Sequence, residues 1–186
     1  MSCSILVDSC SYFRLAQSIN PLLKTPFCEE KYTLGVIKEL NQEHDRNPTL
    51  QHKFYWVDQA EYRENRQRCF SLNTEQKSDI KTACYFIRET GRELGLGASP
   101  VDIKALAYCH VLNIPIVSDD ADMLTLAKEY ELQTYTSLEL LRLLLDCAAI
   151  DMKTVRTIAS YWIYQNDTPK SYKQDYTSLF SEPAPS

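Results

Sequence analysis

Histidine is scarce in this 186-residue chain, and the residues that usually build a structural zinc site are not paired along it. Such sites draw their ligands from closely spaced cysteines and histidines. The three histidines (His44, His52 and His110) show no regular spacing with one another or with cysteine, and no C-x-x-C pair occurs. The sequence therefore argues against structural zinc. The seven cysteines are odd in number and lie mostly in apolar stretches, so we interpret them as free core thiols.

Long apolar runs and a charged leader are also lacking. The chain opens directly on the apolar run Ser4 to Val7, and no uninterrupted hydrophobic segment is long enough to cross a bilayer. This pattern predicts neither a signal peptide nor a membrane partner. We therefore expect a cytoplasmic protein in a reducing compartment.

The chain has no excess of basic residues, since its net charge is −5. Phosphate contacts usually give nucleic-acid-binding proteins a positive charge, so this balance at first argues against such a partner. A cluster of carboxylates around a cation would account for part of the negative charge and would leave the remaining surface free to bind phosphate. At this length, with 44% hydrophobic residues, one domain is the default expectation.

Alternating strand and helix patterns predict an α/β fold. The first half contains a strand over Ser4 to Val7, a helix over 11–23, a second helix from Thr33 that includes Glu39 and is closed by Pro48, and an undecided stretch over 54–57. A firm helix follows over 74–94, and Ser99 with Pro100 then begins a helix that runs to Leu112 and is apolar on nearly all sides.

Further along, we expect strands over 114–117 and 133–136, each followed by a helix, to about 130 and to 147 respectively. This order predicts a three-layer α/β/α domain over 1–147 with a central, mainly parallel sheet. A C-terminal helical extension, 148–186, would contain a helix from about 150 to 165 and a tail that is ordered only where it docks.

Acidic residues fall where the predicted strands end. Asp8 follows the first strand, while Asp119, Asp120 and Asp122 follow the strand that ends at Val117. Ligands of parallel sheets bind outside the carboxyl ends of the strands. Asp102 in the first turn of a helix, and Glu39 within another, could converge on the same edge.

Each of these acids has a simpler explanation. Asp8 and Asp120 could cap the helices that follow them, Asp102 could complete a capping box with Ser99, and Glu39 could be solvated. Caps alone do not require four separate elements to carry acids in this order, and the joint pattern therefore favours a shared site.

The order of these blocks resembles that of the PIN-domain nucleases. The blocks are Ile-Leu-Val-Asp8, Val-Ile-Lys-Glu39-Leu, Ser-Pro-Val-Asp102-Ile-Lys and Ile-Val-Ser118-Asp119-Asp120-Ala-Asp122-Met, and the resemblance spans about residues 4 to 145. It implies that Asp8, Glu39, Asp102 and Asp120 are catalytic metal ligands, with Ser118 auxiliary. Ser118 replaces the family's threonine and Met123 its phenylalanine. Asp119 is an extra acid beside the ligand, and Asp122 matches an acid found in part of the family.

The resemblance also implies an activity. An oxygen-only ligand set suits Mg²⁺ or Mn²⁺, and the family commonly hydrolyses single-stranded RNA to leave a 5′-phosphate. We therefore expect a metal-dependent endoribonuclease, in which no Ser-His-Asp nucleophile is needed. Small PIN proteins are often toxins of toxin-antitoxin modules, so an antitoxin or other protein partner and a homodimer are open alternatives.

Two competing interpretations come from other classes. The fold could serve as a PIN-like scaffold or as an RNA-binding or protein-interaction module that is catalytically weak. A haloacid-dehalogenase-type phosphatase would also place an aspartate after the first strand, but that class requires a second aspartate two residues later, where this chain has Cys10.

A basic stripe is predicted on the long helix. At 100° per residue, its four basic side chains fall within about 60° of one another. They are Lys77, Lys81, Arg88 and Arg92. The stripe could contact RNA phosphates, and an ordinary solvated helix face is the alternative.

Overall fold

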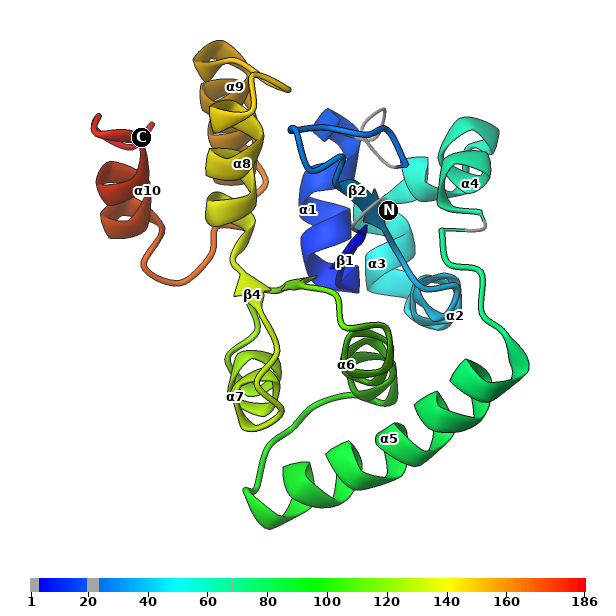
Figure 1. Ribbon diagram of the computed structural model, residues 1–186. Helices are drawn as coiled ribbons and strands as arrows, with labels where there is room; N and C mark the ends of the chain where they lie inside the picture. Colours follow the sequence, from blue (N-terminus) through cyan, green and yellow to red (C-terminus); the bar gives the residue numbers. More distant parts are fainter. Residues whose placement is uncertain (1–3, 20–23, 68) are drawn as a thin grey trace.

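The computed structural model describes residues 4–19, 24–67 and 69–186. In chain order the elements are β1 (Ser4–Val7), α1 (Ser9–Ile19), β2 (Thr33–Gly35), α2 (Glu39–Arg46), α3 (Pro48–Lys53), the 3₁₀-helix η2 (Tyr55–Asp58), α4 (Ala60–Arg66), α5 (Thr74–Glu93), α6 (Pro100–Leu112), β3 (Ile116–Val117), α7 (Ala121–Glu129), β4 (Thr134–Tyr135), α8 (Ser137–Asp146), α9 (Met152–Tyr164) and α10 (Tyr172–Phe180) (Figure 1).

The strands form one parallel sheet in the order β2-β1-β3-β4. From β1 the chain passes to β2 on one side, and it later adds β3 and β4 on the other side. The strand order therefore reverses between β1 and β3, where Val7 pairs with Val117. Such a switch point opens a crevice at the carboxyl ends of the two strands.

Side chains alternate between the two faces of the sheet, as the pleat requires. Ile5, Val7 and Val117 pack into one apolar core, which is shared with α1, α8, α9 and α10. Leu6 and Ile116 pack into a second core with α5, α6 and α7. Figure 1 shows these two groups of helices on opposite sides of the strands, an arrangement compatible with three α/β/α layers.

Most of the predicted elements are confirmed. Helix α5 begins at a capping box formed by Asn73 and Gln76 and is followed by Gly95 in the left-handed region (φ 68°). Ser99 caps α6, and Pro100 is its first residue, as the sequence predicts. The strands over 114–117 and 133–136 are present, although they are shorter than expected.

The helix predicted from Thr33 is wrong at its start. Thr33 to Gly35 form β2, which pairs with β1 over Ser4 to Leu6, and the helix begins only at Glu39. A three-residue strand is too short for its period to be recognised in the sequence, and its pairing partner lies about thirty residues away. The helix ends at Arg46, just before Pro48 as expected, and Pro48 is also the first residue of α3. The undecided stretch 54–57 overlaps η2.

The prediction that all cysteines are free thiols is also wrong. Cys28 and Cys147 form a disulfide, with their Cα atoms 4.9 Å apart, so the segment before β2 is joined to the end of α8. Their separation of 119 residues leaves no local sequence signal. Cys10, Cys69, Cys84 and Cys109 are free, Cys10 is exposed, and Cys3 lies outside the described residues.

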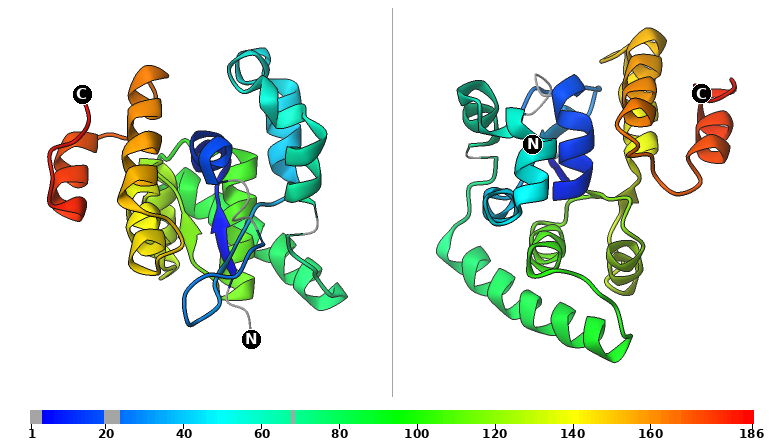
Figure 2. Two further views of the ribbon diagram at one scale, coloured as in Figure 1. Left: turned by 90° about the horizontal axis from the view of Figure 1, so that it is seen from above. Right: turned by 180° about the vertical axis from the view of Figure 1, so that it is seen from behind.

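The C-terminal extension packs into the apolar core that it shares with α1 and α8. Trp162 of α9 is buried and donates its indole N–H to the carbonyl of Arg14 at 3.1 Å. Tyr176 and Phe180 of α10 are buried in the same core, and Figures 1 and 2 show α10 beside α8, far from α5. The tail after 166 thus contains a docked helix. Among the described residues, no helix has both the length and the apolar character needed to cross a membrane.

Candidate metal centre and adjoining groove

Asp8 stands at the end of β1, where the register continues from Val7 beside Val117. Its carboxylate is 4% exposed and accepts hydrogen bonds from Ser11 N at 2.7 Å and from the Ser118 hydroxyl at 2.6 Å. Burial raises the pKa of Asp8 from 3.8 to about 6, although both hydrogen bonds lower it. A carboxylate with this pKa is largely ionised at neutral pH but poorly solvated.

Ser118 connects Asp8 to Asp120. The Ser118 hydroxyl donates to Asp8 and accepts from Asp120 N at 3.1 Å. Asp120 caps α7 by accepting from Met123 N at 2.8 Å with one carboxylate oxygen, and no hydrogen bond from the described residues reaches the other oxygen. The cap expected of Asp120 is therefore real, but it occupies only one of the two carboxylate oxygens.

Asp102 has a similar double character. It forms the capping box with Ser99, whose N–H donates to Oδ2 at 2.8 Å, and within the described residues Oδ1 has no hydrogen bond. Burial, and then the charge of Asp120, raise the pKa of Asp102. The electrostatic coupling indicates that α6 brings Asp102 close to the end of β3.

The structure therefore gathers three of the four predicted ligands. Asp8 and Asp102 line one narrow cleft between β1 and α6, and Asp120 lies beside it. Within the described residues, no three of the predicted acids have ligand atoms within 4.8 Å of one another, a spacing met by the group His44, Asp45 and Asp58.

Glu39 is buried in an adjoining groove. Its Oε1 accepts from Lys104 Nζ at 2.6 Å, while Oε2 is buried and has no hydrogen-bond partner among the described residues. The groove has a volume of about 630 Å³ and lies between α2, α5 and the start of α6. Val101 lines both the groove and the cleft of Asp8 and Asp102, so the two are contiguous.

The other two acids of the motif have strong partners. Asp119 accepts from Ser137 N at 2.9 Å, from the Ser137 hydroxyl at 2.5 Å and from the Arg14 guanidinium. Asp122 accepts from Gly97 N at 2.7 Å and thereby fixes the loop between α5 and α6. These contacts indicate that Asp119 and Asp122 have structural roles next to the cleft.

The predicted basic stripe divides into two pairs. Lys81 and Arg88 line the groove, whereas Lys77 and Arg92 are not among its lining residues. All four are exposed, and Arg92 pairs with Glu89 at 2.7 Å. Only the middle of the stripe therefore faces the groove that adjoins the acids.

Sequence reasoning missed three groove residues, Glu43, Arg46 and Lys104. Glu43 lies one helical turn after Glu39, and this i, i+4 spacing could have indicated it. Lys104 is a cation near the start of an otherwise apolar helix, which is also a readable signal. Arg46 gave no such signal, because it sits in a polar stretch that matches no motif.

Comparison with known proteins adds no relative. Neither a protein-family model, nor a curated protein, nor a solved structure matches this chain.

Proposed function

We propose that the protein is a metal-dependent endoribonuclease of PIN-like fold that hydrolyses single-stranded RNA. The observation that carries this proposal is the convergence of Asp8, Asp102 and Asp120 at the β1/β3 switch point, beside a groove lined by cations. The parallel sheet and two helical layers are compatible with a PIN-like fold, and the order of the acidic blocks supports that specific assignment.

The residues present suit a hard divalent cation. Asp8, Asp102 and Asp120 offer only oxygen, burial raises the pKa of the first two, and Glu39 adds a buried oxygen that lacks a hydrogen bond. Such a set favours Mg²⁺ or Mn²⁺ over softer ions. When bound, the ion would lower the pKa of a water molecule and stabilise the charge that develops on the phosphoryl oxygens.

The chain's own residues would orient the reaction. The Ser118 hydroxyl holds the Asp8 carboxylate through its hydrogen bond to Oδ2, while Ser11 N holds the other oxygen. The caps of α6 and α7 fix Asp102 and Asp120 through one oxygen each and leave the second oxygen free for a ligand. These contacts preorganise the acids and reduce the rearrangement needed when a ligand binds.

The groove suits an RNA backbone. Arg46, Lys81, Arg88 and Lys104 supply positive charge along it, and Tyr85, 59% exposed, offers an aromatic ring on which a base can stack. The negative net charge does not oppose this proposal, because these four cations gather in the groove that adjoins the acids.

A second candidate is a PIN-like scaffold without catalysis. The specific observation in its favour is that Lys104 already neutralises Glu39 and that three of the acids act as helix caps. In this alternative, the carboxylates and cations would serve RNA or protein binding alone.

Cleavage of a mixed single-stranded RNA pool in Mn²⁺ or Mg²⁺ tests the proposal. Wild type should produce shorter RNA with 5′-phosphate ends, and Asp8→Asn should not. Asp79→Asn is a matched control, because Asp79 is exposed on α5 and does not line the groove. Metal binding and RNA binding without turnover in wild type would instead support the scaffold.

A further inference from the structure

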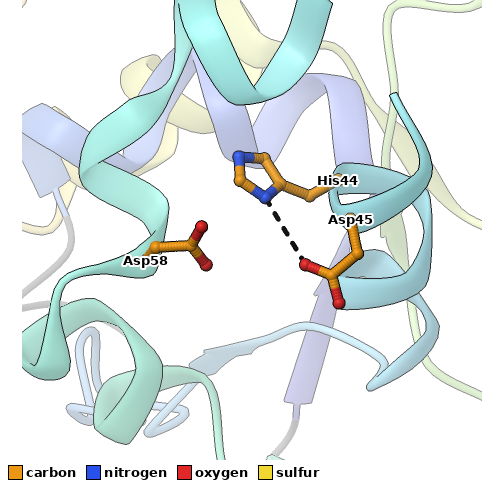
Figure 3. Close-up of side chains that lie close together, drawn as sticks. All are labelled: His44, Asp45 and Asp58. Atoms are coloured by element: carbon orange, nitrogen blue, oxygen red, sulfur yellow. Dashed lines mark ion pairs between the residues drawn. The ribbon is translucent and has the colours of Figure 1, made fainter. Parts of the chain in front are cut away.

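A second group of potential metal ligands lies at the far end of α2. His44 and Asp45 are on α2, and Asp58 is the last residue of η2. One ligand atom from each lies within 4.8 Å of the other two. Figure 3 shows the imidazole of His44 with the two carboxylates on either side of it.

The hydrogen bonds of His44 determine which ring nitrogen is available. Its Nε2 lies 3.3 Å from the carbonyl oxygen of Phe54, and a carbonyl only accepts, so Nε2 carries the proton. In the neutral ring Nδ1 then has a lone pair. His44 is 1% exposed, and its Nδ1 is buried without a hydrogen bond, at 3.9 Å from Asp45 Oδ1.

A histidine with one ring nitrogen donating to the backbone and the other unprotonated is typical of metal ligands. A metal-binding imidazole almost always donates its other N–H to a carbonyl or carboxylate, which fixes the tautomer and the ring orientation. The backbone carbonyl of Phe54 fills that role here, and the free lone pair faces two carboxylates. A buried nitrogen without a hydrogen bond destabilises the fold, and a bound cation would offset this cost.

We propose that His44, Asp45 and Asp58 form a binding site for a first-row transition-metal dication such as Zn²⁺. One nitrogen and two oxygens suit a borderline ion better than Mg²⁺ or Ca²⁺. Ligand atoms around tetrahedral Zn²⁺ are about 3.4 Å apart, so the group must contract slightly. Asp45 and Asp58 are 66% and 46% exposed, which leaves their side chains free to rotate inward.

One cation already competes for the site. Arg63 donates to Asp58 Oδ1 at 3.1 Å, in an ion pair whose two side chains are both largely exposed. Exposed pairs contribute little to stability, so a dication can displace the guanidinium. Removing this arginine should therefore tighten metal binding.

A metal ion bound at this site would restrain a helix that lines the groove. It joins the end of α2 to η2 across α3, and α2 also carries Glu39 and Glu43, which line the groove. A bound ion would hold the groove-lining helix in place from a distance. The proposal does not depend on nuclease activity, because it concerns metal binding at residues outside the cleft of Asp8.

Zn²⁺ titration by calorimetry and thermal melting tests this site. We expect one Zn²⁺ to bind and to raise the melting temperature, including in an Asp8→Asn background, which removes a ligand of the other cluster. Asp45→Asn and Asp58→Asn should each weaken Zn²⁺ affinity at least tenfold. Asp79→Asn, which makes the same exposed change on α5, should leave the affinity unchanged, and Arg63→Gln should increase it.

The imidazole signals give a second measurement. The chain has three histidines, so the ring ¹⁵N resonances are few, and Zn²⁺ should shift Nδ1 of His44 while Nε2 keeps its proton. Unchanged Zn²⁺ affinity in both Asp45→Asn and Asp58→Asn would overturn the proposal. So would a His44 Nδ1 resonance that responds to pH but not to Zn²⁺, because a protonated His44 paired with Asp45 would then explain the geometry.

Discussion

Asp119 and Asp120 are neighbours in sequence but have opposite environments. Asp119 is surrounded by donors, with the Arg14 guanidinium and two hydrogen bonds from Ser137 on its carboxylate. The Asp120 carboxylate accepts one hydrogen bond, from the N-terminus of α7, and within the described residues its other oxygen has no hydrogen-bond donor. Arg14 also contacts Asp167, so the Asp119 side of the motif ties the start of the chain to its C-terminal extension.

The difference shows how acids in one motif can be assigned separate roles. A carboxylate with a cation and several donors has its charge compensated within the protein. A carboxylate fixed only by neutral caps keeps its negative charge available, and burial raises its pKa, as it does for Asp8 and Asp102. The first kind stabilises the fold, and the second kind suits a ligand.

The largest expected effect is on RNA cleavage. Asp120→Asn should lower the rate by about a thousandfold or more, because it removes charge from a ligand of the proposed ion without changing its volume. Circular dichroism should show an intact fold, since asparagine also caps helices. Cleavage at the wild-type rate would contradict the assignment of Asp120, and not Asp119, as a metal ligand.

The second effect is on stability, at the other neighbour. Asp119→Asn should lower the free energy of unfolding by about 3–5 kcal/mol, because it leaves the guanidinium of Arg14 without its main partner in a site where both side chains are 10% exposed. Urea unfolding measures this loss. The folded fraction should still cleave RNA. A fully stable but inactive variant would mean that Asp119 is the ligand.

The third effect is a pH dependence that arises from Asp8. The pKa of Asp8 is about 6 in the folded protein, against an ordinary 3.8. The folded state therefore holds the proton more tightly, and this stabilising contribution is full below about pH 4 and is lost as pH rises through about 6.

Without metal, lowering the pH from about 7.5 to about 5 should stabilise wild type relative to Asp8→Asn by about 1.4 kcal/mol. Parallel denaturant titrations of the two proteins at both pH values measure the difference. The same interval should weaken Mn²⁺ binding, because protons compete for the carboxylate. If the difference in unfolding free energy between wild type and Asp8→Asn does not change with pH, the pKa of Asp8 is not raised in the folded protein.

The smallest effect concerns the groove. Reversing Lys81 and Arg88 to glutamate should weaken RNA binding and reduce the slope of log affinity against log salt by about 1.4, if each contacts one phosphate. Reversing Lys77 and Arg92 makes the same charge change on the same helix outside the groove, and should have a smaller effect. Equal slopes for both double variants would mean that the groove-lining pair has no special part in RNA binding and that the stripe is an ordinary solvent-exposed helix face.

Local signals predicted a large part of the fold. Helix caps and hydrophobic periodicity depend on residues that are close in sequence. They therefore predicted α5, the start of α6 at Ser99 and Pro100, and helices α7 and α8. Strand β2 and the Cys28–Cys147 disulfide depend on residues far apart in the sequence, and neither has a local signature.

The candidate site was predictable to a similar extent. The positions of Asp8 and Asp120 at strand ends indicated that these two acids converge, because the carboxyl ends of parallel strands meet at one edge, and Asp102 was added from the first turn of the helix that leads into β3. The pairing of Glu39 with Lys104 and the saturation of Asp119 by Arg14 depend on side-chain contacts across the fold. The group around His44 was missed because paired cysteines and histidines are the pattern that sequence reasoning looks for, and this group has a single histidine.

The most direct test of the account is Mn²⁺ binding to Asp119→Asn and Asp120→Asn, measured by calorimetry. Both variants should be made in an Asp58→Asn background, so that the proposed site at His44 does not contribute. We expect the Asp119→Asn variant to bind Mn²⁺ with the affinity of its background and the Asp120→Asn variant to lose at least tenfold in affinity. Equal affinities, or a greater loss in Asp119→Asn, would contradict the assignment of Asp120 to a shared metal centre.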